Sequence, residues 1–148
     1  MEHVVEVLFK LDPHQARGMR SECLWAEQVG DRRFRLRNTP MYVSGVSFSD
    51  VVFAQERRGL HYFSGVSIRG GHSTFRILVN AAAERRFPEY WQRLRQLGCR
   101  HEGARPWYAV DVPPTAKLGE VYAVLERGEA DGVWHFEEGH IGHHDDAA

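Results

Sequence analysis

The chain has 148 residues, of which 43% are hydrophobic, 26% charged and 11% aromatic. This composition is typical of one or two small globular cores and excludes an intrinsically disordered chain. A net charge of -1, from 19 Lys and Arg residues against 20 Asp and Glu residues, does not indicate binding to nucleic acid or to an anionic membrane.

Residues 1–70 alternate between apolar and polar side chains, with the period of half-buried β-strands. In residues 32–37, for example, Phe34 and Leu36 alternate with arginines. Gly30 and Asp31 form one of the turns that separate such segments. Five or six short strands are expected here, which favours a small β-barrel or a curled antiparallel sheet. The main segments are 3–11, 21–29, 32–37, 51–55 and 60–68.

After residue 70 the period changes, because apolar side chains now also recur at helical spacing. The expected elements are a strand at 73–79, a helix at 87–97, strands at 99–102 and 106–112, a helix from the N-cap Thr115 to Gly128, and a strand at 133–137. This order is typical of a ferredoxin-like βαββαβ unit with both helices on one face of the sheet. The predicted fold class is therefore α+β.

The predicted organisation is a barrel-like unit over residues 1–70, a ferredoxin-like unit over 71–138 and a polar tail over 139–148. Residues 140–146 contain no apolar anchor except Ile141, so we expect the tail not to pack.

Two cysteines, Cys23 and Cys99, lie far apart and follow no Cys-x-x-Cys pattern. This spacing argues against a disulfide framework or a zinc knuckle and predicts reduced thiols. The N-terminus lacks the basic and apolar regions of a signal peptide, and no apolar run approaches the roughly 18 residues of a membrane span. We therefore expect a cytoplasmic protein with no membrane partner.

A group of histidines and carboxylates near the C-terminus could bind a divalent metal ion. A designed site needs ligands held by a rigid frame, which the polar tail does not offer, so we predict no metal site and no cofactor. The group consists of His135, Glu137, Glu138, His140, His143, His144, Asp145 and Asp146.

No catalytic set is predicted. Ser73 follows His72 directly, and neighbouring residues of a strand point to opposite faces, so His72 is not expected to act on Ser73. No phosphate-binding glycine loop and no RNA-binding aromatic motif occurs, so we expect no nucleic-acid partner. The aromatic pairs Trp107 or Tyr108 and Trp134 or Phe136 are expected to pack under the helices.

Charge is unevenly distributed along the chain. Residues 71–110 carry seven basic and three acidic groups, or +4, whereas residues 111–148 carry two basic and nine acidic groups, or -7. Either the basic first helix faces the acidic second helix and compensates it, or a charged surface meets a partner.

Four short motifs together resemble a bacterial family of domains of unknown function numbered 4265. They lie at residues 21–27 (SECLWAE), 34–40 (FRLRNTP), 49–52 (SDVV) and 71–76 (GHSTFR). The resemblance covers most of the chain. It implies a bacterial, cytoplasmic protein and supplies no activity and no site residues.

Two functional hypotheses follow. The first is a non-enzymatic binding module with a protein partner, of the toxin-neutralising, immunity or regulatory type. The alternative is a small enzyme or ligand-binding module that uses a cleft between the two units. Its candidate ligand-binding residues are Asp50, His72, Ser73 and Arg76, which cluster at the predicted junction.

Overall fold

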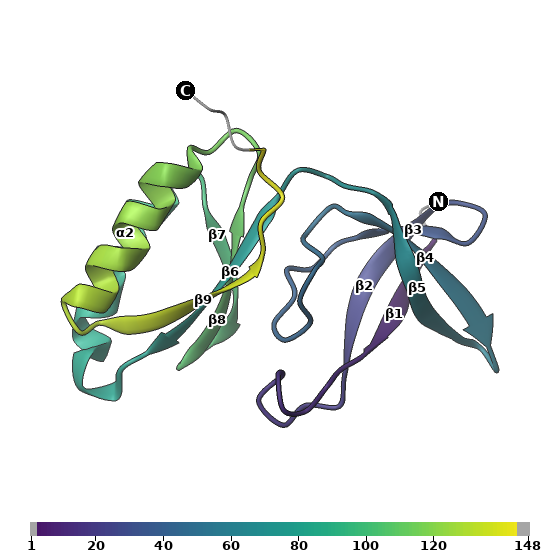
Figure 1. Cartoon of the computed structure of the whole chain (residues 1–148), viewed down its shortest axis with the longest axis horizontal. Helices are drawn as coiled ribbons and strands as arrows, with labels where there is room; N and C mark the ends of the chain where they lie inside the picture. The colour runs from purple at the N-terminus through teal and green to yellow at the C-terminus, as the bar shows by residue number, and fades with distance from the viewer. Residues whose placement is uncertain (1–2, 145–148) are drawn as a thin grey trace.

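The computed structural model describes residues 3–144 and contains two β-sheets that lie side by side (Figure 1). The first sheet is a closed barrel in which neighbouring strands pair in chain order. Its pairs are antiparallel except for β1 and β5, which run parallel where the barrel closes. The strands are β1 (Val4–Lys10), β2 (Ser21–Gly30), β3 (Arg33–Leu36), β4 (Val51–Arg57) and β5 (Leu60–Ile68).

Alternating side chains form the barrel core, as their spacing predicts. In β3, Phe34 and Leu36 are buried while Arg33 and Arg35 are exposed. Val7 and Phe9 of β1 point into the same core, so one face of each strand is buried and the other is exposed to solvent.

The second sheet has four antiparallel strands in the order β7-β8-β6-β9. Helix α2 lies on the side of this sheet that faces away from the barrel (Figure 1). Both helices contribute to one core with the sheet. The elements are β6 (Ser73–Val79), the 3-10 helix η1 (Ala81–Arg86), α1 (Phe87–Gln96), β7 (Arg100–Ala104), β8 (Trp107–Val112), α2 (Leu118–Ala130) and β9 (Trp134–His140). The predicted α+β class is confirmed.

Trp134 organises this second core. Its side chain is fully buried and its indole N–H donates to the carbonyl of Leu125 at 3.0 Å. A Cβ on Gly128 would lie 2.3 Å from the indole, so only glycine lets α2 approach the ring this closely. Gly128 therefore allows close packing inside α2, and the prediction that it ends the helix is wrong. Tyr108 joins the same core, whereas Trp107 points to the opposite face.

Two further boundaries differ from the sequence prediction. Helix α2 begins after Lys117, which has extended backbone angles and no side-chain cap, so Thr115 is not the N-cap. The predicted tail also begins too early, because Gly139 and His140 complete β9 and Ile141 packs against the core. No helix within residues 3–144 is long and apolar enough to cross a membrane.

The two cysteines should differ in reactivity. Burial, with a contribution from Asp111, raises the pKa of the Cys99 thiol to about 12. Partial burial and the neighbouring Glu6 also raise the pKa of the Cys23 thiol, but Cys23 is exposed to reagents whereas Cys99 is buried. Near pH 8 a thiol reagent should therefore modify Cys23 and leave Cys99 intact until the protein unfolds. Mass spectrometry of the labelled protein, with Cys23→Ser as control, measures this. Native-state modification of Cys99 as fast as that of Cys23 would contradict this packing.

Candidate functional site

Arg76, a predicted site residue, lies between the two sheets and is 3% exposed. Its guanidinium donates to the carbonyl of Val43 at 2.9 Å and to the Ser44 hydroxyl at 3.2 Å. Longer contacts reach the Pro40 carbonyl at 3.4 Å and Glu137 Oε1 at 3.3 Å. The side chain thus fastens the loop of residues 37–50, which leads from β3 to β4, onto β6 and β9. Its donors are engaged within the protein and do not face an open cleft.

Carboxylates hold the same loop from both sheets. Glu22 of β2 accepts the backbone N–H groups of Met41, Tyr42 and Val43 at 2.7, 3.0 and 2.9 Å. Glu102 of β7 accepts from the Asn38 side chain at 3.0 Å and from the backbone N–H of Thr39. Sequence reasoning missed both glutamates, because a glutamate on the polar face of a strand is indistinguishable from a solvated one.

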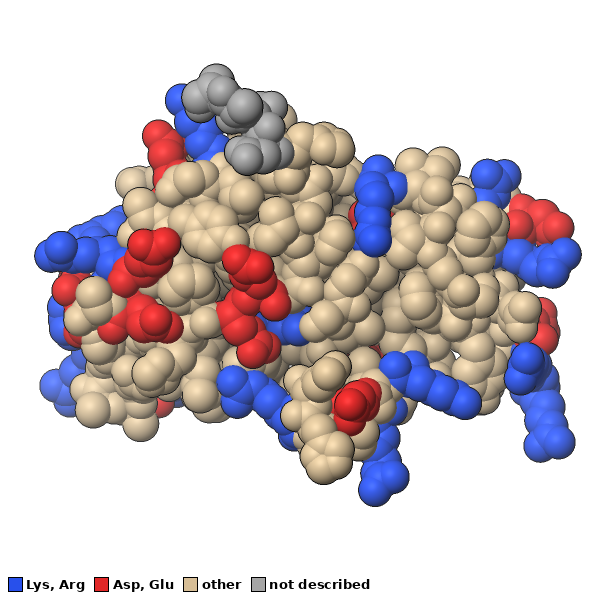
Figure 2. All heavy atoms as spheres, viewed as in Figure 1, with Lys and Arg blue, Asp and Glu red and all other residues tan. Residues whose placement is uncertain are grey.

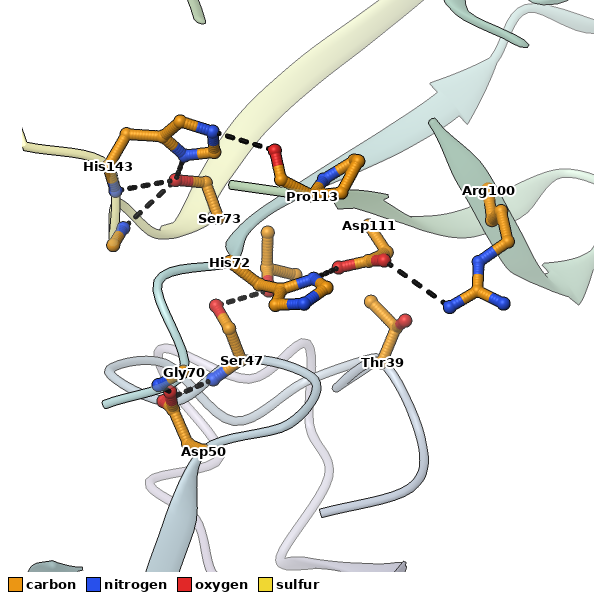
Figure 3. Close-up of polar contacts among 12 residues, drawn as sticks. Thr39, Ser47, Asp50, Gly70, His72, Ser73, Arg100, Asp111, Pro113 and His143 are labelled. Atoms are coloured by element: carbon orange, nitrogen blue, oxygen red, sulfur yellow. Dashed lines mark hydrogen bonds and ion pairs between the residues drawn. The ribbon is translucent and has the colours of Figure 1, made fainter. Parts of the chain in front are cut away.

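Asp50, a second predicted residue, is 1% exposed and closes the end of this loop (Figure 3). Its carboxylate accepts the backbone N–H of Ser47 at 2.9 Å and that of Gly70 at 2.8 Å. Arg69 adds an ion pair at 3.2 Å. Since these bonds satisfy both carboxylate oxygens, Asp50 holds the loop to the segment that links the sheets.

His72, the third predicted residue, pairs with a carboxylate that sequence reasoning missed. Its Nδ1 lies 2.8 Å from Oδ1 of Asp111, which is buried, and Arg100 approaches the other oxygen at 3.8 Å (Figure 3). Because a carboxylate accepts, Nδ1 carries the proton and Nε2 remains a potential acceptor. The available signal was one acidic residue inside the otherwise apolar strand 107–112. The pair has the geometry of a base with its orienting carboxylate.

Ser73, the fourth predicted residue, contacts a different histidine. Its Oγ accepts the backbone N–H groups of Gly142 and His143 at 2.9 and 3.2 Å, and lies 2.6 Å from His143 Nδ1 (Figure 3). His143 Nε2 lies 2.9 Å from the Pro113 carbonyl, which can only accept, so Nδ1 accepts the proton of Ser73. Ser73 is completely buried and fully bonded, which disfavours a nucleophilic role. It anchors residues that the sequence predicts to be a loose tail.

The four predicted residues thus lie around the junction between the sheets, where their polar groups bond to other described residues of the protein. A surface pocket of about 800 Å³ lies beside the start of α2, and the described residues that line it all come from position 71 onward. None of Asp50, His72, Ser73 and Arg76 is among its lining residues.

The histidine group near the C-terminus does not converge. His140 contacts Arg69, whereas His143 contacts Ser73. Within residues 3–144 no three His, Cys, Asp or Glu side chains are placed to hold a metal ion. Asp145 and Asp146 lie outside the described residues.

The acidic side chains gather over α2 and β9 on the face shown in Figure 2. Among the described residues, no ion pair joins an arginine of α1 to a glutamate of α2, and Arg93 of α1 instead pairs with Glu89 at 3.4 Å. Compensation between the two helices is therefore not built from direct contacts, and the acidic surface remains open to solvent.

Replacing Arg76 should destabilise the protein. Arg76→Met would leave buried carbonyls of the loop without donors, and we expect a loss of about 3 kcal/mol in the free energy of unfolding. The exposed Arg95 provides the control, because Arg95→Met should change stability by no more than about 0.5 kcal/mol. Urea unfolding of both variants measures the difference. Equal stabilities would contradict the clamping role of Arg76.

Stability should fall on the acid side of neutrality. Burial, together with Arg69, lowers the pKa of His140 below its usual 6.5, although Asp50 opposes this shift. The unfolded chain then binds the proton more readily, so the stability present above about pH 6.5 is lost as the pH falls further. His140→Gln should reduce this loss between about pH 7.5 and about pH 5 in urea unfolding. His14→Gln, at an exposed position, should leave the loss unchanged, and the opposite ranking would refute this assignment.

Comparisons with known proteins identify a family and a fold. A family model described as a domain of unknown function, DUF4265, matches residues 22–136. The crystal structure of a hypothetical protein from Neisseria gonorrhoeae is similar, with a TM-score of 0.78 at 15% identity, over 97% of this chain and 98% of that one. No curated protein matches. The family match covers most of the chain, including the motifs that hold the loop of residues 37–50, and so the chain belongs to the DUF4265 family.

Proposed function

We propose that this protein is a non-enzymatic binding module that contacts a protein partner through the outer face of its barrel. The partner relationship would be of the toxin-neutralising, immunity or regulatory type. The proposal goes beyond the comparisons, which supply a family without a described activity and a neighbour without an assigned function.

The exposed hydrophobic side chains of the first sheet and its loops support the proposal. Large hydrophobic side chains that are exposed among the described residues all lie within residues 4–68, and none lies in the second sheet or its helices. Clustered apolar exposure marks interaction surfaces more often than scattered single residues do. These side chains are Val4, Met19, Trp25, Val29, Phe53, Leu60 and Ile68.

Trp25 and Phe53 both lie on what we call the barrel face, the outward side of β1–β4. Trp25 lies opposite Glu6, and Phe53 lies opposite Arg33. Trp25 is 50% exposed, so half of a large indole is available to a partner. Tryptophan and arginine are the residues most enriched at the energetic centres of protein interfaces, so this composition supports protein binding.

A small pocket of about 300 Å³ adjoins the barrel face. Phe53 lines it together with the charged Asp31 and Arg32 and the polar Gln55 and Ser64. Interface centres often combine an anchoring side chain with a pocket on the other partner. The pocket thus offers a place for one side chain of the bound protein, next to the exposed phenyl ring.

The bonding of the junction residues favours this hypothesis over the enzymatic alternative. Arg76, Asp50 and Ser73 are buried and engaged in bonds within the protein. The His72–Asp111 pair is the feature that keeps the alternative open, but the described residues place no nucleophile in a bond with His72. The predicted cytoplasmic location and the expected lack of nucleic-acid and membrane partners stay predictions.

We also infer that the second sheet is a ferredoxin-like unit. Two observations support this inference: the strand order β7-β8-β6-β9, and the order of elements along the chain, which is strand, helix, strand, strand, helix, strand. Such a unit would act here as a scaffold that supports the barrel through the loop of residues 37–50.

Affinity capture with matched variants tests the proposed binding face. A protein recovered from source cells should bind the wild type directly, and Trp25→Ala combined with Phe53→Ala should weaken that binding at least about tenfold. Leu60→Ala combined with Ile68→Ala is the control, because it removes side chains of β5 that are at least as exposed as Trp25 and Phe53. Thermal unfolding checks that both double variants remain folded. The absence of a specific partner, or equal losses in the two variants, would overturn the proposal.

A further inference from the structure

We propose that the pocket beside the start of α2 binds a small molecule with an apolar body and a carboxylate group. The pocket has a volume of about 800 Å³, within the range of small-molecule sites in proteins. It lies apart from the barrel face, so the inference is independent of the proposed protein-binding function.

The apolar side of the pocket is held rigidly. Leu118 and Tyr122 of α2 line it. The Tyr122 ring stands edge-on to Phe75 with centroids 5.1 Å apart, and its hydroxyl donates to Glu138. A ring held by both an aromatic contact and a hydrogen bond of its hydroxyl loses little conformational freedom when a ligand packs against it.

Residues 142–144 also line the pocket, and Ser73 holds two of them, Gly142 and His143, in place. Gly142 and His143 donate their backbone N–H groups to Ser73 Oγ, and Gly142 also lies very close to the backbone of His72. A Cβ on Gly142 would lie 2.1 Å from the carbonyl oxygen of His72, so any larger residue must displace this segment. The pocket is therefore preformed, and position 142 controls its shape.

The charge of the lining favours an anion. Lys117 is the charged residue among the described residues that line the pocket, and none of those described residues is acidic. Lys117 is exposed and forms no ion pair with any described residue, so its ammonium group is available to a ligand. One lysine beside an apolar wall fits a single carboxylate on a hydrocarbon ring, since lysine acts as a compact point charge.

The chain allows a specific test because it contains only two lysines, Lys10 and Lys117. Protein labelled with ¹⁵N-lysine gives two backbone amide signals in NMR spectra, and 2-naphthoate serves as the probe. We expect 2-naphthoate to shift the Lys117 signal and leave the Lys10 signal in place. The neutral isostere 2-naphthamide should bind at least about tenfold more weakly, because it lacks the charge that Lys117 attracts.

Substitutions at Lys117 and Gly142 test whether these residues form the binding site. Lys117→Gln should weaken naphthoate binding about tenfold, measured by calorimetry, whereas Lys10→Gln should leave it unchanged. Gly142→Ala should weaken binding of both probes, and its unshifted Lys10 signal reports whether the barrel remains folded. The combined Trp25 and Phe53 variant should bind naphthoate like the wild type, which separates this site from the barrel face. No Lys117 shift, equal binding of the two probes, or unchanged binding by Lys117→Gln would overturn the proposal.

Discussion

The buried guanidinium of Arg76 is the constraint on which the arrangement of the two sheets depends. A charge that is 3% exposed must have its donors bonded, and here the acceptors are backbone and side-chain oxygens of one loop, with Glu137 of β9. Glu22 holds the same loop by its N–H groups, and Asp50 closes its end. The loop of residues 37–50 is thus bonded on both its carbonyl and its amide sides. Through it the barrel and the second sheet behave as one structure, although each has its own core.

The bonding of the loop of residues 37–50 to both sheets changes how the polar residues near the junction should be interpreted. Asp50, Ser73 and Arg76 are predicted from the sequence to bind a ligand because they are polar residues close to a predicted junction. In the structure each satisfies backbone groups that would otherwise be buried without partners, which costs as much as a lost hydrogen bond. A functional surface then has to be sought where side chains are exposed. The barrel face with Trp25 and the pocket with Lys117 are the two such places that the packing supports.

The motifs that identify the family contain residues that bond the loop of residues 37–50 to the two sheets. Glu22 lies in the first motif, Pro40 closes the second, Asp50 belongs to the third and Arg76 ends the fourth. Each contributes an atom that bonds to the loop or belongs to it. These motifs therefore specify how the two sheets are joined. A chain can accordingly be assigned to this family from them without any indication of what its exposed surfaces bind.

The sequence by itself determined the features that depend on neighbouring residues. Alternation across Phe34 and Leu36 identified a strand, and helical spacing from Phe87 placed α1, because these periods follow from local backbone geometry. Tertiary structure decided what each polar group does. The partners of Ser73 and Arg76 lie 70 and 61 residues away in His143 and Glu137, and Gly128 sits inside α2 because Trp134 packs over it. Such contacts leave no periodic trace in the chain, since they arise only when distant segments fold against one another.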